Sequence, residues 1–440
     1  MSLFTIGQKV NKHLKYIKKQ KAGIFVSPVR RIEFVYPLPG ERLCAMTFDD
    51  GPCAAAPTGL DVGLTQHLIS VLADFDARAT FDIIGDTSFN YPDQAGKLNT
   101  AYWGGKKFDH YPDINCDNLA GALHQPELVR KLLAHGHELS NHGYRHMIFG
   151  PMRAIYGRRE YFPSVQTVLD DLDRLHQLVK REFNYKFKLS RPPHYIDNIK
   201  GGFTSYDAYE YMGYNYMAAS FDGGGWLPST GDMATDVEKM VLPLKKALAE
   251  NPEALNGKII FQKDGYNMSK KMPIAFALAK QLEVLKEYGY KVIPVGELIE
   301  LSPFEDLPPN ASCFEAAQGF LKAGKPVGYK NNTFQAQRIM SLGEALALLA
   351  PPAEFSKRLL AKISGQATLN GITVHHPYAG ALAWAKENGI VNWLNKKSEL
   401  DSELLGEILV NIGYNITDLP NGKLNRAQGV KAIWQALQNK

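Results

Sequence analysis

Short apolar runs alternate with amphipathic stretches between residues 43 and 301, and this alternation predicts the fold. Each run is bounded by polar or glycine residues, as is typical of buried strands, at 43–48, 79–85, 214–222, 257–261 and 290–295. Apolar residues with helical spacing predict helices at 65–77, 126–136, 164–183 and 274–288. Repeated strand and helix units favour an α/β fold with a parallel sheet or barrel, whose functional side chains collect at the carboxyl ends of the strands.

The sequence changes in character after residue 303, where it becomes rich in Ala and Leu with a helical pattern. Three segments of this region are weakly similar to one another: FEAAQGFLKAGKPVGYKNNTF, YAGALAWAKENGIVN and LNRAQGVKAIWQAL. Weak repeats of this kind are typical of stacked helical pairs. We therefore expect a basic N-terminal extension at 1–38, an α/β domain at 39–302 and a small all-α module at 303–440.

Charge and hydropathy exclude two classes of partner. A formal net charge of +5 over 440 residues is mild, and dense basic residues occur only near the N-terminus, so we expect no nucleic acid partner. No run of about 18 apolar residues occurs, so we expect no membrane span. The N-terminus lacks the apolar stretch of a signal peptide, which indicates a cytoplasmic protein as written, or a cell-wall or extracellular one if a leader has been removed.

Two adjacent carboxylates, Asp49 and Asp50, end the first apolar run and precede a Gly-Pro break. Neighbouring like charges at the tip of a buried strand lower stability unless a cation or a proton compensates them. The alternative is that the pair forms a turn or a helix cap after the strand. The sequence thus raises the question of what neutralises this pair.

Two histidines, His142 and His146, stand four residues apart in the segment HGYRH. They would share one face if this segment were helical, and could then bind one metal ion. A chance pair of surface histidines is the alternative. Two imidazoles together with the Asp50 carboxylate, with open coordination positions, suit zinc or a related divalent cation used in catalysis.

Several motifs resemble, in order and spacing, those of polysaccharide deacetylases, the family four carbohydrate esterases with the NodB homology domain. These motifs are TFDDGP, ATFDIIG, PELVRKLLAHGHELSNHGYRH, SRPPHY and SFDGGGW. The resemblance implies an irregular (β/α) barrel, which agrees with the alternation of strands and helices. It also implies hydrolysis of an N-acetyl or O-acetyl group on a sugar, with an acetylated polysaccharide or oligosaccharide as substrate.

The resemblance also implies roles for individual residues. Asp49 corresponds to the catalytic base and Arg191 to the arginine that orients it. The implied metal is zinc, with cobalt, nickel or manganese as alternatives, and its implied ligands are Asp50, His142 and His146.

Two further motifs imply how the substrate is held. Asp222 and Trp226 correspond to the first and last positions of a motif that supports the site and walls the substrate groove. Tyr195 is expected to line the same groove. Backbone N–H groups near the turn from Pro193 to Tyr195 would hold the oxyanion of the reaction.

Three positions depart from the family's pattern. Gly143 replaces a small hydroxyl residue that could steady the ligand loop, and Gly225 replaces the second acid of an Asp-x-x-Asp-Trp motif. Lys263 replaces the histidine that protonates the leaving group. Lys263 could itself be the acid, or its side chain could point outward or pair with Asp264.

His194 is a second candidate for the missing acid. The three departures leave two functions open. One is a metal-dependent deacetylase with an atypical general acid. The other is a catalytically impaired glycan-binding protein that keeps the metal site and groove.

The C-terminal module resembles S-layer homology repeats more faintly, through YAGALAWAKENGIVN, PVGYKNNTF and NRAQ. This resemblance implies attachment to a cell-wall polymer, in which Arg426 would make the contact with an anionic chain. A helical domain that only packs on the barrel, or that mediates self-association, is the alternative.

Overall fold

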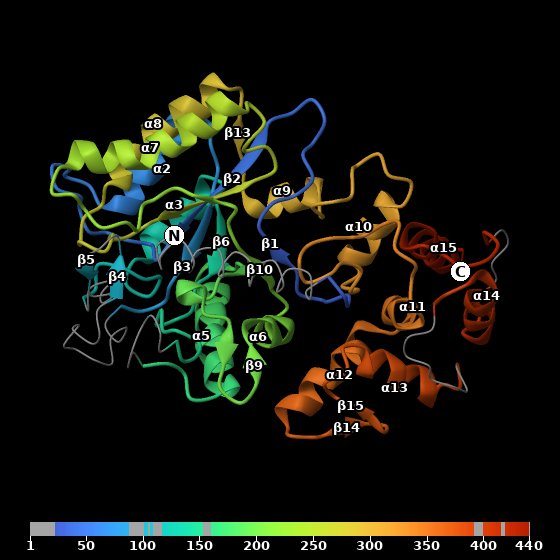
Figure 1. Cartoon of the computed structure of the whole chain (residues 1–440). Helices are drawn as coiled ribbons and strands as arrows, with labels where there is room; N and C mark the ends of the chain where they lie inside the picture. The colour runs from blue at the N-terminus through green and yellow to red at the C-terminus, as the bar shows by residue number, and fades with distance from the viewer. Residues whose placement is uncertain are drawn as a thin grey trace, which may run out of the picture. The chain divides into compact units, whose positions relative to one another are not determined.

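The computed structural model describes residues 23–87, 101–103, 106–108, 117–152, 160–390, 399–414 and 419–439. It divides into two compact units, one formed by Glu33–Leu301 and the other by Met1–Ile32 with Ser302–Lys440 (Figure 1). Most of the basic N-terminal segment, residues 1–22, lies outside the described residues. Among the helices described, none is long and apolar enough to span a membrane.

The unit Glu33–Leu301 is built on a parallel sheet. Its strands follow the order β10, β7, β6, β3, β2, β12, β11, and β13 also pairs with β2. The bounds are β2 Leu43–Asp49, β3 Thr80–Ile83, β6 Glu138–Asn141, β7 Leu189–Ser190, β10 Asn215–Met217, β11 Phe221–Asp222, β12 Ile259–Lys263 and β13 Lys291–Val292. Among the described residues, the strand pairs within this order are parallel, as the alternation of strands and helices predicts.

The sheet curls into an irregular barrel, which confirms the expected fold class. The segment 214–222, expected to be one strand, forms β10 and β11 instead, and these stand at opposite ends of the strand order. Met217 and Phe221 are four residues apart, so the chain between them spans at most about 14 Å. A flat sheet would separate these strands by roughly 29 Å, six times the spacing between neighbours. The sheet therefore has to bend back on itself.

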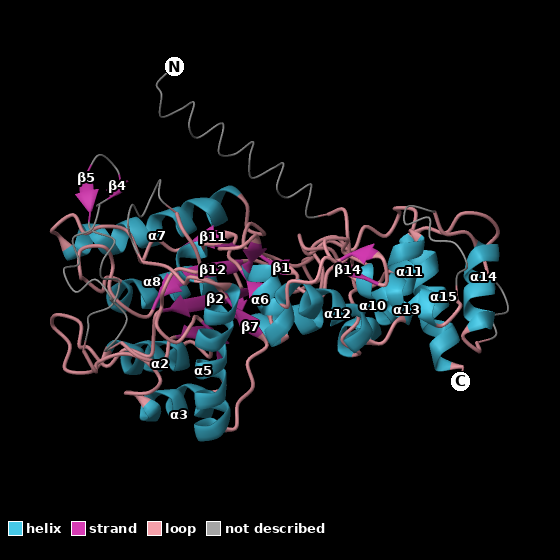
Figure 2. Cartoon of the chain, turned by 90° about the horizontal axis from the view of Figure 1, so that it is seen from below, coloured by secondary structure: helices cyan, strands magenta, loops and turns pink. Residues whose placement is uncertain are grey.

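Helices lie on both sides of the strands (Figure 2). They are α2 Leu64–Asp74, α3 Pro126–Ala134, α5 Val165–Phe183, α6 Ser205–Met212, α7 Met233–Glu250, α8 Ile274–Glu287 and α9 Val295–Leu301. Two antiparallel hairpins complete this unit, β4 Ala101–Trp103 with β5 Lys106–Phe108 and β8 Asn198–Ile199 with β9 Phe203–Thr204. All seven residues of β2, a central strand of this sheet, are buried, including the carboxylate at its end.

The second unit is mainly helical, with α10 Phe314–Lys322, α11 Leu342–Leu349, α12 Pro352–Ile363, α13 Ala379–Glu387, α14 Ser402–Asn411 and α15 Arg426–Gln438. It also contains the short hairpin β14 Thr368–Leu369 with β15 Ile372–Thr373, which the expected all-α module lacks. Residues 23–32, expected to belong to an extension, cluster with this unit and include β1 Arg31–Ile32. Within the unit, the Val26 N–H donates to the Tyr378 hydroxyl at 3.0 Å.

A ring of three backbone hydrogen bonds lies at the centre of this unit. The Met340 N–H donates to Leu424 O, Leu424 N–H to Leu400 O, and Leu400 N–H to Met340 O, at 2.8–2.9 Å. Each of these residues precedes a helix-capping side chain, Ser341, Asp401 or Asn425, that accepts a hydrogen bond from the first turn of its helix. Three capped helices therefore begin at one ring, and one of them, α15, carries the third of the weakly similar segments.

The expectation that Arg426 contacts an external polymer is wrong. Its side chain is 1% exposed, its Nε donates to Phe334 O at 2.7 Å, and its Nη1 lies 3.3 Å from Glu344 Oε1. Because the guanidinium is enclosed by its own unit, it cannot also bind an anionic chain in solvent.

Candidate metal and catalytic site

Three charged residues lie in one row across neighbouring strands. The parallel register pairs Asp49 with Asp82 of β3 on one side and with Lys263 of β12 on the other. Residues in register on adjacent strands direct their side chains to the same face of a sheet. The row stands at or near the carboxyl ends of these strands, where functional groups of α/β barrels collect.

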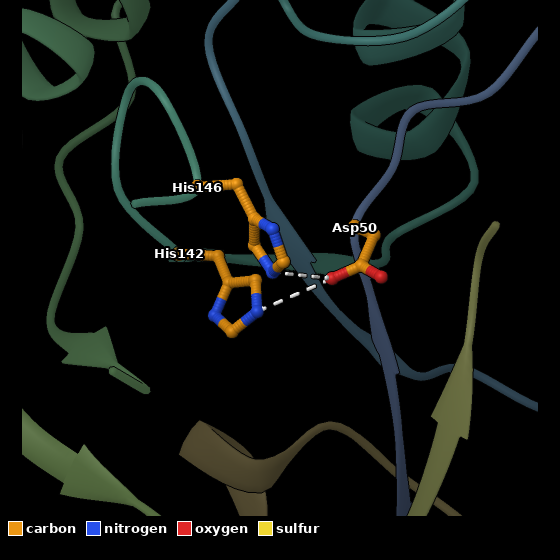
Figure 3. Close-up of side chains that lie close together, drawn as sticks. All are labelled: Asp50, His142 and His146. Atoms are coloured by element: carbon orange, nitrogen blue, oxygen red, sulfur yellow. Dashed lines mark ion pairs between the residues drawn. The ribbon is translucent and has the colours of Figure 1, made fainter. Parts of the chain in front are cut away.

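The three expected metal ligands converge next to this row (Figure 3). Asp50 Oδ1 lies 3.3 Å from His142 Nε2 and 3.1 Å from His146 Nε2. All three side chains are buried, with 2–3% of each residue exposed. Asp50 and His146 adopt positive φ values of 80° and 52°, in the left-handed region that non-glycine residues seldom occupy. Strain of this kind is common where a site fixes the direction of a side chain.

The HGYRH segment is a loop that follows β6, not the helix that would place both imidazoles on one face. The loop is held by Asp171 of α5, whose Oδ2 accepts from the Tyr144 N–H at 2.7 Å and whose Oδ1 accepts from Arg145 Nε at 3.0 Å. Gly143 has φ +85°, and a Cβ built on it would lie 3.2 Å from Asp171 Oδ2. The loop thus has its own support in place of the hydroxyl group that Gly143 lacks.

Asp49 and Arg191 form a fully buried ion pair between Asp49 Oδ1 and Arg191 Nη1. The guanidinium also donates from Nε to Met217 O and from Nη2 to Ala218 O, both at 3.3 Å, so its orientation is fixed. Asp49 Oδ2 lies 3.7 Å from His142 Nε2. Burial raises the pKa of Asp49 to about 7, and the charge of Arg191 acts in the opposite direction. A carboxylate with this pKa is suited to general base catalysis near neutral pH.

Asp82 is a site residue that sequence reasoning missed. Its Oδ2 lies 2.7 Å from His142 Nδ1, which also lies 2.8 Å from Arg191 O. Two acceptors at Nδ1 fix the proton there and leave Nε2 of the neutral ring as an acceptor that can bind a metal. Burial lowers the pKa of His142, but the carboxylates of Asp82 and Asp49 raise it well above its usual value. The available signal was an Asp inside the apolar run ATFDIIG.

The donor set fits a divalent metal ion. Two imidazole Nε2 atoms and one carboxylate oxygen, all buried, lie within 4.8 Å of one another. Such acceptors, turned toward one point, repel one another unless a cation or protons lie between them. Asp50, His142 and His146, the ligands that the family resemblance implies, form this group, and among the described residues Asp49, Asp82 and His142 form another of the same kind.

Lys263 points into the barrel. It is 6% exposed, and its Nζ makes an ion pair with Asp50 Oδ2, so the outward orientation is wrong.

The Asp264 carboxylate accepts hydrogen bonds from Thr65 Oγ1 at 2.6 and 2.8 Å, and burial raises its pKa to about 8. A Cβ at Gly51 would lie 2.0 Å from Asp264 Oδ2, which explains the glycine after the carboxylate pair.

His194 and Tyr195 lie in a turn of 3-10 helix, Pro193–Tyr195, with φ values of 56° and 57°. The His194 ring centre lies 5.2 Å from that of His146, and the Arg191 guanidinium lies 5.4 Å from the centre of the Tyr195 ring. The Tyr195 N–H donates to Pro192 O at 2.9 Å. This donor is therefore already used within the turn, which argues against Tyr195 N–H as the expected oxyanion donor.

Asp222 is exposed and contacts Trp226, whose Nε1 donates to Asp222 Oδ2 at 2.8 Å. Its Oδ1 accepts from the Gly224 N–H at 2.8 Å. Among the described residues its carboxylate has no hydrogen bond or ion pair with Asp49 or Arg191. Asp222 therefore positions the Trp226 ring, and the structure gives it no contact with the reacting groups.

Gly225 lies beside the end of β12. A Cβ built there would be 3.4 Å from both Gln262 Oε1 and Lys263 N. Gln262 is fully buried, and its Nε2 donates to Gln281 Oε1 at 2.7 Å. The position that lacks an acid at Gly225 is thus backed by a buried glutamine pair.

Comparison with known proteins gives consistent matches. The family model described as polysaccharide deacetylase matches residues 38–198. A peptidoglycan-N-acetylglucosamine deacetylase of Bacillus cereus is 25% identical over 264 residues, which cover 59% of this chain and 89% of that protein. The family match includes the candidate ligands, the base and its arginine, and ends before Trp226 and Lys263.

Solved structures show a weaker likeness. A peptidoglycan deacetylase from Bacillus subtilis is 20% identical, with a TM-score of 0.39, and the match covers 60% of this chain and 92% of that one. A chitin deacetylase from Colletotrichum lindemuthianum is 20% identical, with a TM-score of 0.41, and the match covers 62% and 92%.

Proposed function

We propose that this chain carries a polysaccharide deacetylase domain whose barrel hydrolyses acetyl groups on an acetylated polysaccharide or oligosaccharide. The observation that carries the proposal is the convergence of Asp50, His142 and His146 beside the buried Asp49–Arg191 pair. A site with two histidines, one carboxylate and open positions is typical of catalytic zinc, so we propose zinc as the bound ion, with cobalt, nickel or manganese as substitutes.

The residues around the ligands divide the chemistry between them. A bound divalent ion supplies Lewis acidity toward the acetyl carbonyl and lowers the pKa of water. Asp49 acts as the general base through Oδ2, since Arg191 already holds Oδ1. Arg191 fixes the carboxylate in one orientation because its remaining donors are tied to the backbone. Trp226, held by Asp222, walls the groove in which the sugar lies.

The leaving group requires a proton donor, and the site favours His194. The Lys263 ammonium is engaged with Asp50, whereas His194 is half-buried next to His146. Imidazole is the side chain most often used for proton transfer near neutral pH. An alcohol leaves from an ester more readily than an amine leaves from an amide without full protonation. We therefore expect O-acetyl esters to react faster than N-acetyl amides.

The test is acetate release from a panel of O-acetylated and N-acetylated glycans, with and without added divalent ions. Wild type is compared with Asp49→Asn and with Asp173→Asn, a matched change at an exposed carboxylate on α5. The proposal requires metal-stimulated release that only Asp49→Asn abolishes. Equal release from all three proteins contradicts it. No release from any of them, with glycan binding retained, supports the alternative of a glycan-binding protein that keeps its groove.

For the second unit we propose attachment to a cell-wall polymer. The three capped helices that begin at one ring support the resemblance to S-layer homology repeats. The contact cannot use Arg426, which is buried. Co-sedimentation of the full chain with purified wall polymers tests the proposal, and a chain that stays in the supernatant with every polymer contradicts it.

A further inference from the structure

The site holds more negative charge than its arginine can balance. Asp49, Asp50 and Asp82 are all buried, and the Arg191 guanidinium pairs with the first of them. Buried carboxylates without a compensating charge are strongly destabilising. The need for a compensating charge is greatest at Asp50, because one of its oxygens faces two imidazoles. Its other oxygen contacts Lys263.

We propose that Lys263 is a built-in counter-ion of the metal site, which stabilises the metal-free protein and lowers its affinity for the divalent ion. This inference rests on the metal site of the proposed function. Lys263 takes Asp50 Oδ2, so that Asp50 offers only Oδ1 to a metal held with the two histidines. It also places a positive charge next to the position of the ion, and like charges at this range repel strongly in a buried site.

The backbone keeps Lys263 at this position. Lys263 is the last residue of β12 and is in register with Asp49 of β2. The hydrogen bonding between the ends of β12 and β2 continues at the next residue, where the Asp264 N–H donates to Asp49 O at 2.6 Å. The backbone of the lysine therefore cannot move away from Asp49 when a metal binds without breaking the pairing of two central strands. A buried side chain that is 6% exposed also has little room to swing into solvent.

Two effects of opposite sign follow for Lys263→Met, which keeps an unbranched side chain but removes the charge. The metal-free protein loses the partner of a buried carboxylate and should melt at a lower temperature. The metal-bound protein loses a repulsion and gains the second oxygen of Asp50, so its affinity should rise by about tenfold or more. A purely structural lysine would lower stability without raising the affinity for metal.

The experiment measures zinc and cobalt binding by calorimetric titration, and thermal unfolding in excess chelator, for wild type, Lys263→Met and Lys291→Met. Lys291 is an exposed control on β13, which pairs with the start of β2, whereas Lys263 pairs with its end. We expect tighter binding and a lower metal-free melting temperature in Lys263→Met, and neither change in Lys291→Met. Both readouts are independent of turnover.

The outcomes separate this inference from the proposed function. Metal binding by wild type with equal or weaker binding by Lys263→Met overturns the counter-ion role and leaves the metal site standing. No binding by either protein overturns both. Binding by Lys263→Met alone supports the role in its strongest form. Should Lys263→Met fail to fold, Lys263→Gln provides the same comparison, and Lys263→Arg, which keeps the charge, should leave the affinity near that of wild type.

Discussion

Each unit of the protein contains a fully buried arginine paired with a buried carboxylate, and only one of these pairs belongs to a candidate active site. Arg191 pairs with Asp49 in the barrel, and Arg426 lies 3.3 Å from Glu344 in the helical unit. Each guanidinium also donates to backbone carbonyls and lies near two aromatic rings. Burial and ion pairing alone therefore do not distinguish a catalytic arginine from a structural one.

The carboxylates make the difference. Both oxygens of Glu344 are used, since Oε1 accepts from the Tyr329 hydroxyl and Oε2 accepts from the Ser341 N–H at 2.8 Å. In the barrel, Asp49 Oδ2 faces His142 and Asp82 Oδ2 contacts the other side of the same ring, whereas Asp82 Oδ1 has no hydrogen bond within the described residues. Native proteins seldom leave buried polar atoms unsatisfied. The combination of an unsatisfied carboxylate and converging acceptors indicates a site that is completed by a ligand.

Matched amide substitutions should separate the two pairs most clearly. Asp49→Asn should lower kcat/KM for acetate release by about 10²- to 10⁴-fold, because the general base is lost. Glu344→Gln should leave turnover unchanged but destabilise the helical unit by about 3–5 kcal/mol, because it leaves a buried guanidinium unpaired. Steady-state kinetics and thermal unfolding measure the two effects. A large loss of turnover in Glu344→Gln would remove the distinction drawn between the pairs.

His194→Gln tests the proton donor on the side of the site opposite to the base. It should lower turnover of N-acetylated substrates by about 10²-fold, at the lower end of the range for general acid catalysis, and that of O-acetylated substrates less. The measurement is the ratio of the two rates in each protein. A uniform loss on both substrates would instead indicate that His194 only shapes the groove or supports His146.

Asp82→Asn tests whether the unsatisfied carboxylate acts on the metal. His142 keeps its second acceptor, Arg191 O, so the ring should retain its orientation while the charge behind it is removed. Outer carboxylates of this kind are worth about 10- to 100-fold in metal affinity. Zinc titration should therefore show weaker binding, the reverse of the effect expected for Lys263→Met. Unchanged affinity would make Asp82 a structural residue like Glu344.

Local sequence patterns were sufficient to predict the residues whose position depends on a single strand or helix. Asp49 and Asp50 end an apolar run, and the helices at 126–136 and 164–183 match α3 and α5 closely. Asp82 was missed because its role depends on the register of β3 with β2, which no local pattern encodes. The conformation of the loop at His142 was left open because a four-residue spacing is compatible with either a helix or a loop.

Long-range packing explains the other differences between expectation and structure. Lys263 could have pointed either way from its strand, and the register with Asp49 decides that it faces Asp50. Arg426 follows a helix cap, where side chains are often exposed, but its guanidinium is enclosed by the carbonyls of Val327 and Phe334 and by the Glu344 carboxylate. Asp171 was detectable in part, since it interrupts the apolar face of a long amphipathic helix.

The smallest expected effect concerns Asp222, to which the family resemblance assigns a supporting role in the site and which the structure places on Trp226. Since its carboxylate accepts from the indole N–H and not from the reacting groups, Asp222→Asn should raise KM a few-fold, on the order of the 0.5–1.5 kcal/mol of one hydrogen bond, with kcat nearly unchanged. Trp226→Phe removes the same bond from the other partner and should give a similar change. If kcat fell in Asp222→Asn while Trp226→Phe changed only KM, the Asp222 carboxylate would act on the reaction itself. In that case the exposure of Asp222 would no longer distinguish it, as a positioning residue, from the buried acids Asp49 and Asp82.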